Sequence, residues 1–142
     1  MKQNKFSVVA ITLLLIAFSA TSWVTPKHRS HPSDVTITAV YDFSTFPHVT
    51  GTFTTTGAFT ITGTSTMYVV PNQNGIRAHC DVVLYPSGGG TIIIDQECEF
   101  AGTAPWRGQW QIVSGTGAYA NLHGNGSLTM PPNTEAMTGV IY

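Results

Sequence analysis

The stretch "RAHCDVVLYPSGGGTIIIDQECEF", residues Arg77 to Phe100, has the hydrophobic pattern of a β-hairpin. Its centre, Pro86-Ser87-Gly88-Gly89-Gly90, has the composition of a turn. On either side, apolar and polar residues alternate with period two, which is typical of strands with one buried face. The stretch therefore predicts two antiparallel strands joined by a glycine-rich turn.

Two cysteines suggest a register for this hairpin. Placing Cys80 opposite Cys98 centres the turn on Gly89 and gathers the apolar residues of both strands on one face. Directly opposed residues lie about 4.5 to 5.5 Å apart at Cα, which is within disulfide range. We therefore expect a Cys80–Cys98 disulfide. A reactive thiol beside His79 is the weaker alternative, because His79 has the opposite parity.

The same alternation continues through the rest of the chain, without a sustained helical period. Most threonines between Thr50 and Thr66 share one parity, so they are expected to face outward, and Gly57 or Gly63 should mark a bend. Eight antiparallel strands predict a single closed β-barrel over residues 34–142, with a sandwich as the alternative. The expected strands are Val35–Phe43, Thr50–Thr56, Phe59–Val70, Ile76–Tyr85, Thr91–Phe100, Trp106–Ile112, Gly126–Met130 and Met137–Tyr142.

The N-terminal residues predict export. Lys2 and Lys5 precede an apolar run, Val8–Phe18, and small residues lead to a cleavage site after Ser22, which is the pattern of a secretory signal peptide over residues 1–22. The run is too short for a transmembrane helix. Residues 23–33 contain two prolines and are expected to form an exposed leader. The mature protein is therefore expected to be secreted or periplasmic.

Charge narrows the class of partner. From residue 34 onward the only basic residues are Arg77 and Arg107, against all seven acidic residues of the chain. Such a balance disfavours nucleic acids and anionic membrane surfaces, which bind basic patches.

The segment Trp110–Leu128, "WQIVSGTGAYANLHGNGSL", is rich in glycine. It lacks the further glycine and the lysine of a phosphate-binding loop. A structural interpretation is favoured, in which the glycines permit bends and one helical turn places an apolar pair at one end of the barrel. The residues of this structural motif are Gly115, Gly117, Tyr119, Leu122 and Gly124.

This segment, together with "GTFTTTGAFTITGT" before it and "TGVIY" after it, resembles small exported bacterial proteins of the allene oxide cyclase-like barrel group, which is similar in fold to plant dirigent proteins. The resemblance covers most of residues 35–142. It implies a barrel that holds a hydrophobic intermediate and shapes its cyclisation or coupling, with no cofactor. The catalytic residues of the group match no motif of this chain, so the catalytic residues are unknown.

Three inward-facing polar groups are candidates for ligand binding in the lumen: Tyr41, Gln96 and Trp110. A mostly apolar cavity with a few fixed polar groups is the usual form of a small-molecule site. The alternative is that these groups satisfy one another in a filled core. The sequence thus leaves three functions open: binding of a small hydrophobic ligand, a cofactor-free cyclase or isomerase, and a structural or surface-interaction protein.

The outer face carries acidic residues. In the proposed register Asp81 lies opposite Glu97, so Arg77, Arg107 or a cation is expected nearby, because opposed like charges are unfavourable. The five histidines show no metal-ligand spacing, and no metal site is predicted. The outward apolar residues Val83, Tyr85 and Ile93 suggest a homo-oligomer.

Overall fold

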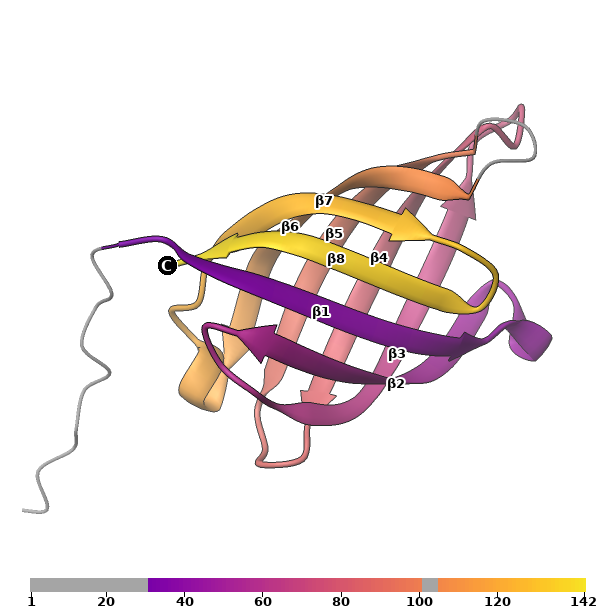
Figure 1. Cartoon of the computed structure of the whole chain (residues 1–142). Helices are drawn as coiled ribbons and strands as arrows, with labels where there is room; N and C mark the ends of the chain where they lie inside the picture. The colour runs from indigo at the N-terminus through magenta and orange to yellow at the C-terminus, as the bar shows by residue number, and fades with distance from the viewer. Residues whose placement is uncertain (1–30, 101–104) are drawn as a thin grey trace, which may run out of the picture.

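The computed structural model describes residues 31–100 and 105–142, and they form a closed barrel of eight antiparallel strands in sequential order (Figure 1). The predicted fold class is confirmed. The expected signal peptide and residues 23–30 of the expected leader lie outside the described residues. The strands are β1 Ser33–Asp42, β2 His48–Gly57, β3 Thr62–Pro71, β4 Arg77–Pro86, β5 Thr91–Glu99, β6 Trp106–Thr116, β7 Gly124–Met130 and β8 Thr134–Ile141.

The barrel closes between its first and last strands, which lie side by side in Figure 1. Ser33 pairs with Ile141 and Val40 pairs with Thr134, so β1 begins one residue before the expected boundary at Asp34. Closure leaves neither terminal strand with an unpaired edge. Among the described residues, no helix is both long and apolar enough to span a membrane.

The interior of the barrel is filled along most of its length. Most inward-facing side chains are buried, as the alternation predicts, and a barrel of eight strands is only just wide enough for its own side chains. The largest fully buried apolar side chains are Trp110, Phe53, Ile37, Met67, Leu84, Ile92, Ile94, Leu128 and Met137.

The connection between β2 and β3 is longer than the sequence predicts. Gly57, with a φ of 97°, ends β2, and β3 begins at Thr62 rather than Phe59. Thr55, the one threonine of this region with inward parity, is fully buried. Its hydroxyl donates to the Phe59 carbonyl and accepts from the Ile61 amide, both at 3.0 Å. Burial of this hydroxyl is therefore matched by local backbone partners.

The expected register of the β4–β5 hairpin is wrong by two residues. Cys80 pairs with Gln96 and Cys98 pairs with Ala78, so the hairpin is centred on Gly88. The reason is the turn itself, in which the Gly89 amide donates to the Pro86 carbonyl at 2.9 Å. A shift of two residues keeps every side chain on its face, so the predicted faces are still correct.

The corrected register changes the relation between the cysteines. Cys80 and Cys98 are diagonal neighbours, which lie about 7 to 8 Å apart in a sheet, and direct bonding at more than about 7 Å requires a backbone shift. Both are free, buried thiols in the structure, so the expected Cys80–Cys98 disulfide is not formed there. A hydrogen bond with Cys98 and burial raise the pKa of the Cys80 thiol.

Candidate functional site: a cavity above a buried carboxyl group

A cavity of about 660 Å³ lies at one end of the barrel. The β1–β2, β3–β4 and β7–β8 connections lie at this end, on the right of Figure 1, where β5 ends and β6 begins. The lining is mainly apolar, with Phe43 and Phe46 from the first connection and Met67 and Cys80 from the walls. Aromatic side chains, prolines and Met130 complete the lining. The cavity therefore offers a mainly apolar surface.

A polar cluster is buried next to the inner end of this cavity. The Tyr41 hydroxyl donates to Glu135 Oε2 at 3.2 Å, joining β1 to β8. The Tyr41 amide also donates to the Asn133 carbonyl at 2.9 Å, which fixes the two strands relative to each other. Glu135, Gln96 and Ser65 are each at most 1% exposed. These four side chains, Tyr41, Ser65, Gln96 and Glu135, are named here the Glu135 cluster.

The protonation of the Glu135 cluster is set by its burial. Burial raises the pKa of Glu135 to about 7, and interactions with Tyr41 and Gln96 oppose this shift. Burial, followed by the Glu135 charge, raises the pKa of Tyr41 well above its ordinary value. Near neutral pH, Tyr41 is therefore a neutral donor, while Glu135 can take up or release a proton.

Three polar atoms of the Glu135 cluster have no hydrogen-bond partner among the described residues: Glu135 Oε1, Gln96 Oε1 and the Ser65 hydroxyl oxygen. The Gln96 amide nitrogen instead donates to the Met137 sulfur at 3.2 Å. Buried acceptors without donors are uncommon in proteins and call for a specific explanation. The cluster thus holds two acceptors and one hydroxyl group that no described residue pairs.

Of the three lumen residues predicted from sequence, the structure brings two together. Tyr41 and Gln96 belong to the Glu135 cluster. Trp110 is buried, but its indole nitrogen donates to the Ser127 and Thr138 carbonyls at 3.1 and 3.3 Å. Its polar atom is therefore satisfied by backbone, and it does not belong to the Glu135 cluster.

Sequence reasoning missed Glu135. The expected last strand began at Met137, whereas β8 begins at Thr134. Extending the alternation back by one step from Met137 would have placed Glu135 on the inward parity. An acidic residue interrupting the apolar parity of a strand was the available indication.

The glycine-rich segment lies at the opposite end of the barrel, at the β6–β7 connection. A short 3-10 turn, Gly117–Tyr119, begins at a glycine with a φ of 62°, a conformation that favours glycine. Tyr119 and Leu122 are partly buried against the core. Adding a Cβ at Gly115 would bring it to 2.3 Å from the Tyr119 carbonyl oxygen. The glycines of this segment thus serve close packing at that end.

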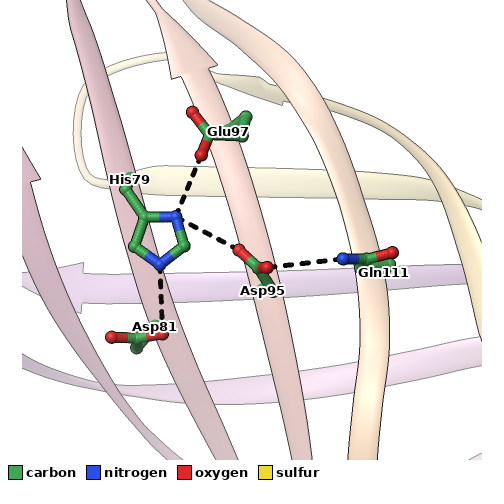
Figure 2. A network of polar contacts seen from close by, with 5 residues as sticks. All are labelled: His79, Asp81, Asp95, Glu97 and Gln111. Atoms are coloured by element: carbon green, nitrogen blue, oxygen red, sulfur yellow. Dashed lines mark hydrogen bonds and ion pairs between the residues drawn. The ribbon is translucent and has the colours of Figure 1, made fainter.

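A second polar group lies outside the barrel on β4 and β5 (Figure 2). The corrected register places Asp81 opposite Asp95 and His79 opposite Glu97. The His79 ring stands between these carboxylates: Nδ1 is 3.0 Å from Glu97 and 3.3 Å from Asp95, and Nε2 is 3.4 Å from Asp81. The imidazole therefore separates the opposed acids.

Neither arginine fills the role that the sequence suggested. Arg77 pairs with Glu99 at 3.6 Å, and the positive charge near Asp81 comes instead from His79. The hydrogen bond to Glu97, followed by the charges of Asp95 and Asp81, raises the pKa of His79. Ligand atoms of His79, Asp95 and Glu97 lie within 4.8 Å of one another. A protonated His79 satisfies this geometry by ion pairing.

Comparison of the chain with protein-family models, with curated proteins and with solved structures found no match.

Proposed function

We propose that the protein binds a small hydrophobic molecule in the apolar cavity at the open end of the barrel. The observation that carries the proposal is the cavity itself, about 660 Å³ in volume and lined mainly by apolar side chains. Ligand sites in proteins are commonly about 300 to 1,000 Å³ and combine apolar walls with a few fixed polar groups. The adjacent Glu135 cluster provides such groups.

The cavity walls are well suited to a planar or chain-like apolar body. Phe43, Phe46, Phe100 and Trp106 line it, and Phe100 packs on Trp106 with ring centroids 5.9 Å apart. Aromatic side chains provide large contact areas at low entropic cost. Met67 can adapt its shape because its side chain is unbranched. Binding would therefore depend on apolar contact rather than on charge.

The test uses 1,6-diphenylhexatriene, a hydrocarbon that fluoresces in apolar surroundings. Met130, in the cavity lining, is replaced by Trp to occupy the cavity, and Tyr85, 42% exposed on the outer face of β4, is replaced by Trp as the matched control. We expect saturable binding by the wild type, about tenfold weaker binding by Met130→Trp and unchanged binding by Tyr85→Trp. Failure of the wild type to bind, or equal binding by Met130→Trp, would refute the proposal.

A cofactor-free cyclase or isomerase is the second candidate function. The supporting observation is that Glu135, with a pKa raised to about 7, contacts the Tyr41 hydroxyl close to an apolar cavity. A general acid or base acts best when its pKa is near the working pH. Conversion of a bound compound that Glu135→Gln abolishes, while that compound still binds, would support this function. Export and homo-oligomer formation remain predictions, to be tested by fractionation and light scattering.

A further inference from the structure

We propose that the bound molecule carries a hydrogen-bond donor, a hydroxyl or a protonated amine, at one end of its apolar body, and that Glu135 and Gln96 accept hydrogen bonds from it. This inference rests on the proposed binding of a hydrophobic molecule and adds the chemical class of its polar end. It follows from the position of the Glu135 cluster and from its unpaired acceptors.

The cluster forms the layer directly beneath the cavity lining. Three cluster residues lie two positions along the chain from a cavity residue: Tyr41 precedes Phe43, Ser65 precedes Met67, and Glu135 follows Asn133. Two residues along a strand span about 7 Å. A polar group at the inner end of a ligand therefore needs to pass one layer of side chains to reach Glu135.

Two side chains of the cavity lining lie near the cluster. Cys80 lines the cavity and is also close enough to Glu135 for the two to influence each other electrostatically. Met67 lines the cavity on β3, and its flexible side chain can move without a change in the backbone. We infer that the donor group passes between Met67 and Cys80.

The unpaired acceptors of the cluster favour a ligand whose polar group donates hydrogen bonds. Glu135 Oε1 and Gln96 Oε1 are buried and accept from no described residue, and the Ser65 hydroxyl is also unpaired. The Tyr41 hydroxyl is already directed at Glu135 Oε2. A donor on the ligand would pair the two acceptor oxygens. An ester could accept from Ser65 but would leave both acceptors unpaired, and a carboxylate would place a second negative charge beside Glu135. Sites with buried acceptors discriminate strongly against ligands that cannot donate.

The experiment compares ligands of similar chain length in displacing 1,6-diphenylhexatriene at pH 8. The donors are 1-decanol and decylamine, the acceptor-only compound is methyl nonanoate, and the anion is decanoate. For the wild type we expect both donors to bind at least about tenfold more tightly than the ester, with decanoate weakest. Glu135→Gln keeps an acceptor oxygen but loses the negative charge, so it should reduce the decylamine-to-ester ratio to about threefold or less. Glu99→Gln, an exposed carboxyl on the outer face, should keep the wild-type ratio.

The pH dependence separates the two donors. Decylamine should bind more tightly as the pH rises from 6 to 8, because Glu135 gains its negative charge, whereas 1-decanol should not. Among the described residues, the other titratable groups that face Glu135 are Tyr41 on β1 and Cys80 on β4. The pKa values of both are raised, so they stay neutral in this range.

The outcomes distinguish this inference from the proposed function. Absence of hexatriene binding would refute both. Binding of hexatriene with no preference for donors over methyl nonanoate, or a preference for decylamine that Glu135→Gln leaves intact, would refute only the donor-bearing ligand.

Discussion

Glu135→Gln should make the free energy of unfolding less dependent on pH. Burial raises the pKa of Glu135 from its ordinary 4.5 to about 7. Between these pH values the folded protein binds more protons than the unfolded chain, so the free energy of unfolding falls as pH rises. Each pKa unit corresponds to about 1.4 kcal/mol, so the wild type should lose about 3 kcal/mol between pH 4.5 and pH 8 from this residue alone. A glutamine is neutral at every pH and can still accept from Tyr41.

The assay is urea unfolding of the wild type and Glu135→Gln at five pH values from 4.5 to 8.5. The difference between the two proteins removes the contributions of all other titrating groups. It should be small at pH 4.5 and should grow to about 3 kcal/mol in favour of Glu135→Gln above pH 8. Glu99→Gln is the control, because its carboxyl is exposed at the surface. A difference that changes by less than about 1 kcal/mol across this range would refute the argument that Glu135 is buried and raised in pKa.

Three further predictions follow from the packing and the outer surface. Gly108→Ala should destabilise the barrel by about 1 to 3 kcal/mol, because the new Cβ would lie 2.0 Å from the Glu97 carbonyl oxygen. Gly88→Ala is the neutral control, because a Cβ there would have nothing within 4 Å. Equal urea midpoints for the two variants would contradict this prediction. NMR titration should give His79 a pKa above its ordinary 6.5. Its ion pairs therefore contribute stability that is lost as the pH rises through this raised pKa. A measured pKa at or below 6.5 would contradict the proposed pairing. Thiol titration of the unfolded, unreduced chain should find both cysteines free, and fewer than two thiols would show that the bond forms after a backbone shift.

The β4–β5 hairpin shows how much of the fold could be predicted. Alternation of apolar and polar residues identifies both strands and their buried faces, because side chains in a strand point alternately to opposite sides. The alternation does not identify which residue lies opposite which. A slip by two residues preserves both faces, and the hydrogen-bonded turn at Pro86–Gly89 decided between registers that the pattern could not distinguish.

The candidate site could likewise be predicted from the sequence only in part. Tyr41 and Gln96 were predictable as polar residues on the inward parity, and Glu135 was within reach of the same argument had the last strand been extended. Their meeting was not predictable, because Tyr41 and Glu135 are 94 residues apart in the chain and come together only where β1 pairs with β8. Nor could the parity of Trp110 show that backbone carbonyls would satisfy its indole.

The sequence by itself thus determined an all-β chain with a buried and an exposed face on each strand, because that information is local and repeats every two residues. The tertiary structure decided the cysteine register, the pairing of His79 with three carboxylates and the burial of Glu135 beneath an apolar cavity. Each of these depends on how strands are staggered against their neighbours and on how the barrel closes, and both are set by contacts between distant segments rather than by any local pattern.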